Sequence, residues 1–322
     1  MKKAFKVILI VVLVVIVIAG SLALFINFRK MPVYHAEKIT IKVEATTQRI
    51  AQGKKLASML CFSCHYNEQT QKFTGRLLSE APQFGEIHSA NITNDAIAGI
   101  GKLSDGDLIY FIRTGIKPDG QYIPPYMPKL IHIADEDLYS IIAYLRSDDN
   151  YVRADNSRAP KSIPSFFTKF LLTIKAFKPF DYPKEPIPLP DTTNQVTWGR
   201  YITLYQYECY TCHSKDFATN NYGVPGKSPG FFGGGNKMYQ LNGSSISTLN
   251  ITPDKETGIG DWTADDFVKA VKTGVVPSGQ PSLRYPMIPY INLTDVELKA
   301  IYAYLSTVPS IKNKVERKFA DQ

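Results

Sequence analysis

The sequence predicts an all-α protein in which two tandem domains of one fold follow a single N-terminal transmembrane helix. Three observations support this prediction. The pentapeptide Cys-Phe-Ser-Cys-His at residues 61–65 recurs as Cys-Tyr-Thr-Cys-His at residues 209–213, and the same short motifs follow both copies in the same order. Helix-start signals followed by apolar residues at helical spacing occur in each copy. An uncharged apolar run, residues 7–28, is long enough to cross a bilayer as a helix.

The N-terminal segment, residues 1–30, is expected to be an uncleaved signal anchor that spans the membrane over residues 7–28. Ala19 and Gly20 are small, so a cleavable signal peptide is the competing interpretation, but the apolar run continues as far as Phe28. The lysines that precede the run favour a cytoplasmic N-terminus. We therefore expect a single-pass protein of the cytoplasmic membrane whose domains lie on the periplasmic side.

The net charge of +8 does not indicate nucleic-acid binding. Residues 1–30 hold five basic side chains and no acidic one, whereas residues 31–322 hold 32 basic and 29 acidic side chains. The positive charge therefore belongs mostly to the anchor. A hydrophobic content of 44% and a charged content of 20% are typical of globular domains.

All four cysteines belong to the two Cys-x-x-Cys-His pentapeptides. Two thiols three residues apart share one helical turn and can form thioethers to one porphyrin, and the following histidine can bind its iron. Zinc knuckles pair such units about 15–20 residues apart, whereas these lie 148 residues apart. A thioredoxin-like motif needs no following histidine, and a Cys-x-x-Cys disulfide is a poor structural staple. The pattern therefore predicts two covalently bound haem c groups, with these residues as thioethers and proximal iron ligands: Cys61, Cys64, Cys209, Cys212, His65 and His213.

An internal duplication organises the rest of the chain. Four motifs recur at an offset of 159 residues: Asn-Ile-Thr at 91 and 250, Gly-Ile-Gly at 99 and 258, Arg/Lys-Thr-Gly at 113 and 272, and Gly-Gln at 120 and 279. The second copy has 11 extra residues between its pentapeptide and Asn-Ile-Thr. Asn-Ile-Thr also matches the glycosylation sequon, but its identical place in both copies favours a structural role, through hydrogen bonds near a haem edge or in the turn before Gly-Ile-Gly. We expect one domain over residues 45–148 and another over residues 193–310.

Each predicted domain has helices at matching places. Residues 48–60 and 196–207 are expected to form helices that lead into the pentapeptides, and their glycines, Gly53 and Gly199, could allow close approach of each domain's last helix. Three residue pairs have the spacing that begins a helix: Ser104 with Asp107, Thr263 with Asp266, and Thr294 with Glu297. The first-copy equivalent of Thr294 is Ala134, so we expect Asp135 to replace it as the cap.

Residues 149–192 are predicted to be a proline-rich linker with a short amphipathic helix. Seven prolines between Pro160 and Pro190 exclude continuous regular structure. A stripe of apolar residues at helical spacing lies within the linker: Phe166, Phe167, Phe170, Leu171, Ile174 and Phe177. We expect this stripe to pack against a domain or to bridge both domains, with contact to a membrane surface or partner as the alternative.

Met127 and Met287 are expected to be the second axial ligands of the two irons. They occupy equivalent positions in proline-rich loops between two predicted helices, and proline restricts such loops. Filling a gap in the core is the commoner role of methionine, but the equivalent placement favours ligation, since His/Met is a known haem coordination. The other candidates are less suitable: Met238 has no counterpart in the first copy, and His35, His88 and His132 all lie in or before that copy.

With these motifs, each copy resembles a bacterial class I cytochrome c domain. The Asn-Ile-Thr, Gly-Ile-Gly, Thr-Gly and Tyr-Pro-Met-like pattern is similar to that of the cytochrome c subunits of membrane-bound alcohol and gluconate dehydrogenases. The resemblance implies ligation by His65 with Met127 and by His213 with Met287, and electron transfer from a partner dehydrogenase toward the respiratory chain. The chain differs from those subunits in having two haem motifs where they usually have three.

His/Met coordination fills both axial positions and leaves no open site for oxygen, peroxide or substrate. We therefore expect a membrane-anchored dihaem electron carrier and not an enzyme. A dihaem peroxidase is the main enzyme alternative, but it needs a haem that can open a coordination site. A dihaem subunit of a terminal oxidase would share the chemistry and differ in its partner. A thiosulfate-oxidising enzyme with a cysteine axial ligand is excluded because no cysteine remains.

Overall fold

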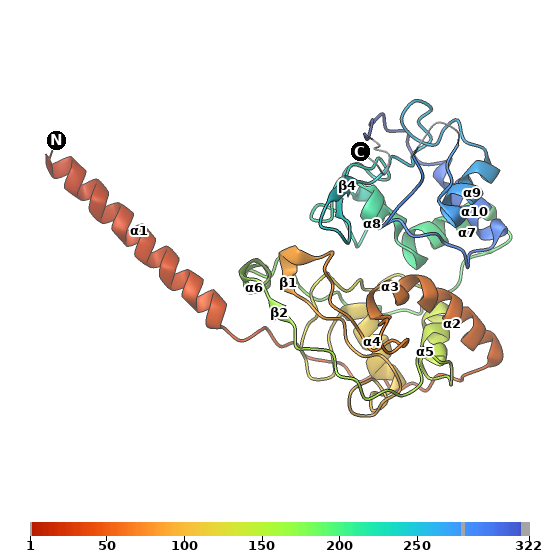
Figure 1. Cartoon of the computed structure of the whole chain (residues 1–322), viewed down its shortest axis with the longest axis horizontal. Coiled ribbons are helices and arrows are strands. Elements are labelled where there is room, and N and C mark those ends of the chain that lie inside the picture. The colour runs from red at the N-terminus through yellow and green to blue at the C-terminus, as the bar shows by residue number, and fades with distance from the viewer. Residues whose placement is uncertain (1, 278–280, 317–322) are drawn as a thin grey trace.

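The structure is a computed structural model that describes residues 2–277 and 281–316 (Figure 1). It is mainly helical, as predicted, and a long N-terminal helix projects from a body of two lobes (Figure 1). The first lobe contains α2 (Thr47–Leu60), α3 (Phe62–His65), α4 (Asp105–Thr114), α5 (Asp135–Leu145) and α6 (Phe166–Thr173). The second lobe contains α7 (Gln195–Tyr201), α8 (Cys209–His213), α9 (Ala264–Thr273) and α10 (Asp295–Leu305).

The N-terminal helix α1 (Lys2–Phe28) includes the whole apolar run. It is long and apolar enough to cross a membrane, and no residue of its most apolar stretch is buried. A signal sequence would have the same properties, so the helix alone does not separate an anchor from a cleaved signal.

Each lobe contains an equivalent pair of closely packed helices. An added Cβ atom at Gly53 in α2 would lie 1.8 Å from the Ser140 carbonyl oxygen of α5. At Gly199 in α7 it would lie 1.8 Å from the Ala300 carbonyl oxygen of α10. The predicted close approach is therefore confirmed in both lobes, because only a residue without a side chain leaves room for the facing backbone.

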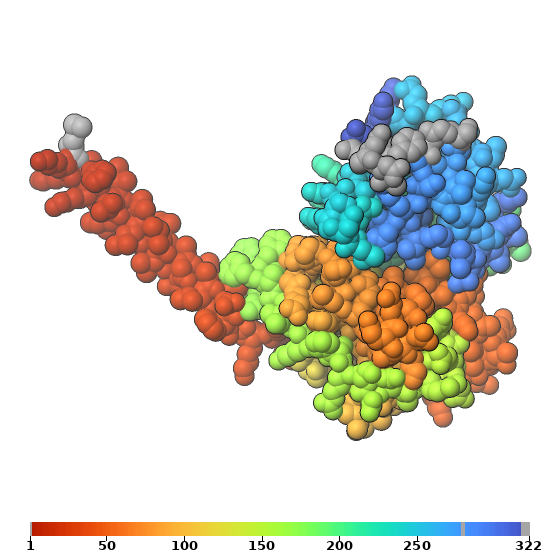
Figure 2. All heavy atoms as spheres, viewed as in Figure 1, coloured from red at the N-terminus to blue at the C-terminus, as the bar shows by residue number. Residues whose placement is uncertain are grey.

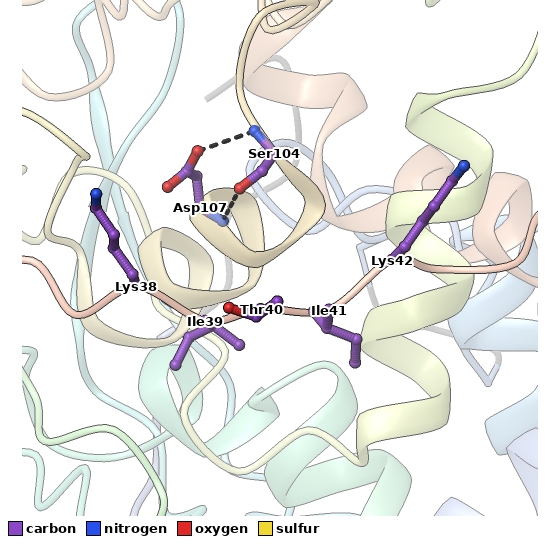
Figure 3. Close-up of a pocket in the computed structure, with 7 residues that line it drawn as sticks. All are labelled: Lys38, Ile39, Thr40, Ile41, Lys42, Ser104 and Asp107. Atoms are coloured by element: carbon purple, nitrogen blue, oxygen red, sulfur yellow. Dashed lines mark hydrogen bonds between the residues drawn. The ribbon is translucent and has the colours of Figure 1, made fainter.

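Helix starts follow the predicted caps with one exception. Capping boxes begin α4, α9 and α10, and Figure 3 shows the reciprocal bonds of Ser104 and Asp107 at the start of α4. The prediction that Asp135 caps α5 is wrong. Its carboxylate instead accepts hydrogen bonds from the buried Arg113 guanidinium at 2.5 Å and from the Ile187 amide at 3.1 Å. A buried cation needs this partner more than an exposed helix end does.

The helix predicted over 196–207 changes character partway. It is α-helical to Tyr201 and continues as a π-helical turn over Ile202–Gln206, a geometry frequent at functional sites. The 11 extra residues of the second copy lie between His213 and Phe232, because the bond from the Ile251 amide to the Phe232 carbonyl matches that from Ile92 to Phe73 at the offset of 159. The hairpin of β3 (Lys237–Tyr239) and β4 (Ser245–Ser247) follows them. Met238 lies in this hairpin.

The proline-rich segment 149–192 runs along the first lobe. Its strand β2 (Ile163–Pro164) pairs with β1 (Gly85–Glu86), which follows a short 3₁₀ turn, Pro82–Phe84. The Phe180 amide donates to the Thr114 carbonyl at 3.3 Å. The stripe predicted from Phe166 onward does include a helix, α6, which is shorter than the stripe.

The lobes are packed together through polar contacts between their helix pairs. Asp137 of α5, only 3% exposed, accepts hydrogen bonds from the Tyr201 hydroxyl at 2.5 Å and the Gln206 side chain at 2.8 Å. Lys55 of α2 forms an ion pair with Glu297 of α10. A single cluster of buried apolar side chains also extends through both lobes. The two lobes therefore share a core.

A surface hollow lies between the extended segment 38–42 and the start of α4 (Figure 3). Its lining contains no cysteine, histidine or methionine: it consists of Lys38, Ile39, Thr40, Ile41, Lys42, Ser104 and Asp107. The hollow therefore contains none of the predicted haem-binding residues.

Candidate haem-binding sites

The first pentapeptide occupies the junction of α2 and α3. α2 ends at Leu60, and Cys61 and Cys64 lie on the turn that continues into α3. All four cysteines are free, and each is half-buried. Burial raises the pKa of the Cys61 and Cys209 thiols to about 12. A thiolate is disfavoured here, whereas a neutral thioether suits such surroundings.

Both motif histidines are oriented by a backbone carbonyl. The Nδ1 atom of His65 lies 2.8 Å from the Ala90 carbonyl oxygen, and that of His213 lies 2.8 Å from the Leu249 carbonyl oxygen. Burial lowers the pKa of both rings, which favours the neutral imidazole. Nδ1 then carries the proton that it donates, and Nε2 presents a lone pair, the form that binds a metal.

The repeated Asn-Ile-Thr motif fixes these carbonyls in place. Asn91, next to Ala90, donates to the Asp155 and Ser157 carbonyls at 2.8 Å and accepts from the Thr93 amide. In the second lobe, Asn250 follows Leu249 in the same way and donates to the Ile311 carbonyl at 2.7 Å. The prediction of a structural role in this turn is confirmed. Sequence reasoning missed the link to the histidine, because the histidine and its carbonyl lie 25 residues apart in the first copy and 36 in the second, and no local pattern joins them.

The two sites differ where the chain passes between their cysteines. In the first, the Ser63 carbonyl accepts bonds from the Arg76 guanidinium at 2.6 and 2.8 Å. Arg76 also pairs with Glu80 at 2.5 Å. In the second, the Thr211 carbonyl accepts a bond from the neutral Asn220 side chain at 2.7 Å. The first site therefore has an ion pair where the second has a neutral amide.

The Met127 loop is held by a buried lysine. The Lys129 ammonium, 5% exposed, donates to the Pro124 carbonyl at 2.8 Å and to the Met127 carbonyl at 2.7 Å. Burial lowers its pKa to about 7. Met127 itself is half-buried and its amide donates to Pro124 at 3.2 Å. These contacts fix the backbone that presents the Met127 side chain.

Met287 is likewise half-buried, and its amide donates to the Arg284 carbonyl at 3.0 Å. Burial and the nearby Cys209 and Cys212 raise the pKa of Tyr290, three residues further on. The Met287 loop therefore runs beside the second pentapeptide.

In each lobe one segment contacts both the pentapeptide and the methionine loop. In the first, Ser89 donates to the Cys64 carbonyl at 2.5 Å, and the Phe84 and Tyr126 rings lie 5.6 Å apart. In the second, Asn236 donates to Thr211 at 3.4 Å and Gln240 donates to the Tyr285 carbonyl at 3.2 Å. The two copies thus build the same neighbourhood with different residues.

The remaining histidines have other contacts. His132 Nε2 lies 3.0 Å from the Tyr222 carbonyl oxygen, and its ring packs against Tyr205 at the lobe boundary. His88 pairs with Glu86 at 3.2 Å. His35 accepts a hydrogen bond from Tyr110 through its backbone carbonyl at 3.4 Å.

The residues present fit a haem in each lobe. The two Cys-x-x-Cys units lie in different lobes, so they do not form one four-cysteine zinc site (Figure 1). Beside the second pentapeptide, the Tyr207 hydroxyl and the Ser214 hydroxyl are buried without a hydrogen-bond partner among the described residues. Orphaned polar atoms of this kind indicate a neighbouring group that satisfies them.

No protein-family model matches the chain. It is 27% identical over 278 residues to the cytochrome c subunit of a quinone alcohol dehydrogenase from Gluconobacter oxydans, which covers 83% of this chain and 56% of the relative. It is 44% identical over 112 residues to the gluconate 2-dehydrogenase cytochrome c subunit of Pantoea cypripedii, 34% of this chain and 22% of the relative. A dihaem cytochrome c from Cereibacter sphaeroides is 26% identical over 78% of this chain and 83% of the relative.

The chain spans about half the length of several of these curated relatives. The resemblance predicted from the motifs is nonetheless confirmed over most of the chain. By sequence, the chain is a relative of the cytochrome c subunits of alcohol, fructose and gluconate dehydrogenases and of a dihaem cytochrome c.

Proposed function

We propose that this protein is a membrane-anchored dihaem c-type cytochrome that carries single electrons between a dehydrogenase and the respiratory chain. The observation that supports this most is the matched pair of carbonyl-oriented histidines, His65 and His213, each beside two free cysteines. In this proposal the sites are two domains of class I cytochrome c type, residues 45–148 and 193–310.

Each site has residues that could bind the porphyrin covalently and residues that could bind the iron on both sides. Cys61 and Cys64, and Cys209 and Cys212, would hold the porphyrins as thioethers. His65 and His213 would bind the irons through Nε2, with Met127 and Met287 as the opposite ligands. Haem c supplies a centre that gains and loses one electron. The protein holds the imidazole rings at a fixed orientation, and with the methionines bound as well the irons would have no place for a substrate.

The contact between lobes supports electron exchange between the sites. Tyr285, two residues before Met287, is hydrogen-bonded to Glu80 of the first lobe. Glu80 pairs with Arg76, and Arg76 bonds to the backbone between Cys61 and Cys64. A short chain of bonded groups therefore joins the methionine loop of one site to the pentapeptide of the other.

The comparisons and α1 support the partners of this proposal. Relatives named as dehydrogenase cytochrome subunits favour a dehydrogenase as donor. In the proposal α1 crosses the cytoplasmic membrane once, with the haem domains on the periplasmic side and a respiratory-chain component as acceptor. The chain then has no catalytic residues of its own and serves as an electron-transfer subunit.

The experiment is a potentiometric titration of the detergent-solubilised full chain, followed by absorbance and electron paramagnetic resonance. Two low-spin haems per chain with positive potentials are expected. A high-spin ferric signal from half of the iron, or turnover of hydrogen peroxide, would instead identify a dihaem peroxidase. Proteins that co-purify with the chain from native membranes would identify the donor, and recovery of a terminal oxidase would replace the dehydrogenase in this proposal.

A further inference from the structure

The helix α6 has an apolar face of which about half is exposed in the described chain. Its opposite side packs on the first lobe: Thr168 is 0% and Leu172 1% exposed, and the Thr168 hydroxyl donates to the Phe84 carbonyl at 3.0 Å. Phe166 and Phe167 are 48% and 52% exposed, and Ile174 is 55% exposed. The half-buried Phe170 and Leu171 lie on the same side of the helix as these three.

This face lies level with the end of the apolar run of α1. The Lys169 ammonium of α6 donates to the backbone carbonyl and the side-chain oxygen of Asn27, both at 3.0 Å. Asn27 is the second-last residue of the uncharged run 7–28. Figures 1 and 2 show α6 beside the end of α1 that meets the body. If α1 spans a bilayer, α6 is therefore at the boundary between acyl chains and headgroups.

The charge around α6 suits an anionic surface. Residues 157–180 include five basic side chains and no acidic one, and Lys175 and Lys178 just after the helix are exposed. Arg29 and Lys30, which follow the apolar run, are exposed as well. Aromatic and aliphatic side chains on one face, bordered by lysines, characterise helices that lie in a membrane surface.

We propose that α6 lies on the bilayer surface, with Phe166, Phe167 and Ile174 in the headgroup boundary and the neighbouring lysines on anionic phospholipid. This inference rests on the proposed function in one respect, that α1 spans the membrane. α6 then seats the first lobe on the membrane. Through the ring contacts of Phe84 with Phe177 at 6.1 Å and with Tyr126 at 5.6 Å, it ties the Met127 loop to that surface.

The test uses the full-length holoprotein in liposomes of phosphatidylcholine and phosphatidylglycerol that contain a photoactivatable phosphatidylglycerol. After illumination and trypsin digestion, mass spectrometry finds which peptides carry lipid. We expect adducts on α1 and on peptides 162–169 and 170–175. Peptide 216–227 of the second lobe is the matched control, since it also exposes apolar side chains, Phe217 at 43% and Val224 at 50%, and should stay unlabelled.

The outcomes separate the two proposals. Adducts on α1 without adducts on α6 would overturn the surface contact and leave the anchor intact. No adduct on α1 would overturn the anchor and, with it, the depth assigned to α6. Phe166→Ser combined with Phe167→Ser should remove the label from peptide 162–169 while α1 stays labelled. If α6 is unlabelled in liposomes but resists chymotrypsin in native membranes, a protein partner covers it and the inference is wrong.

Discussion

At the scale of single residues, the chemistry of each site depends on a few groups whose roles can be tested one by one. The orientation of His65 comes from a carbonyl, and that carbonyl is positioned by Asn91. The methionines are presented by loops whose backbones have their own contacts. Both arrangements lead to specific predictions.

Met127→Ala and Met287→Ala should each open one coordination site. Half of the ferric haem should then become high-spin, and one of the two reduction potentials should fall, because the neutral thioether that favours the reduced iron is gone. Electron paramagnetic resonance and potentiometry measure both effects. Met238→Ala, in the β3–β4 hairpin, is the matched control and should leave both spectra unchanged. Unchanged spectra for Met127→Ala would refute that ligand.

Asn91→Ala should destabilise the first lobe by about 1–3 kcal/mol, because the Asp155 and Ser157 carbonyls lose a buried donor. It should also alter the spectrum of the haem bound to His65, since the carbonyl behind the ring is released. Urea denaturation and low-temperature absorbance provide the two readouts. Asn94→Ala, which loses only a 3.3 Å bond, should leave the spectrum as it is. A spectral change of equal size in both variants would contradict the positioning role of Asn91.

At the scale of elements, the sequence predicted most of the helices and the close crossings between them. Capping pairs and apolar spacing located the helices, because those signals act within a few residues. The glycines in α2 and α7 indicated close crossings, and they occur there. Asp135 was missed because its partners, Arg113 and Ile187, are distant in sequence. The sequence also did not predict that amide side chains take the place of Arg76 in the second site, because this depends on tertiary contacts of the same kind.

Gly53→Ala should destabilise the first lobe by about 1–3 kcal/mol, since the new methyl group would lie 1.8 Å from the Ser140 carbonyl oxygen and the helices must separate. Thermal denaturation measures the effect. Gly226→Ala is the control, because an added Cβ there meets nothing within 4 Å. Equal melting temperatures for the two variants would exclude the tight crossing of α2 and α5.

Asp149 predicts a pH dependence of the α2–α5 contact. Burial alone would raise its pKa, but hydrogen bonds from Lys54 at 2.6 Å and Tyr144 at 3.0 Å outweigh burial and hold the pKa below its usual range. Because the folded-state pKa is below the unfolded-state value, the stabilisation is present above about pH 4 and disappears as the pH falls through the folded-state pKa.

Asp149→Asn should therefore lower the free energy of unfolding by about 1–3 kcal/mol at pH 7. The difference from the parent chain should shrink below about pH 4 as the parent carboxylate becomes protonated. Urea titrations between pH 7 and pH 3 test this. A difference that stays constant over the whole range would show that the charge of Asp149 does not contribute.

At the scale of the whole molecule, the sequence indicated two copies but not how they meet. Asp137 looks like an ordinary first-turn carboxylate of a helix, yet in the structure it is buried against the π-helical turn of the other lobe. Such contacts join residues 64 and 69 positions apart, which no local pattern reveals. The exposed face of α6 could not be predicted either, because the stripe of apolar residues alone did not show which of them the first lobe covers.

Asp137→Ala should uncouple the lobes. The Tyr201 hydroxyl and the Gln206 amide lose a buried acceptor, at a cost of about 1–3 kcal/mol for each unsatisfied group. Calorimetry of the parent chain should show one cooperative transition, and that of the variant should show two. Asp261→Ala, an exposed aspartate of the second lobe, should retain the single transition. Two transitions in the parent chain would contradict a shared core.

The hydrogen bonds that position the carbonyl behind each histidine can form only after a later part of the chain has been synthesised. In the first lobe it closes on Asp155 and Ser157, and in the second on Ile311, so each is completed by chain that is synthesised after the motif it serves. When each pentapeptide leaves the ribosome, the carbonyl that orients its histidine ring is therefore not yet fixed in place. Any machinery that joins porphyrin to the cysteines has an interval in which the motif is still open, and for the second lobe that interval lasts until Ile311 has been synthesised.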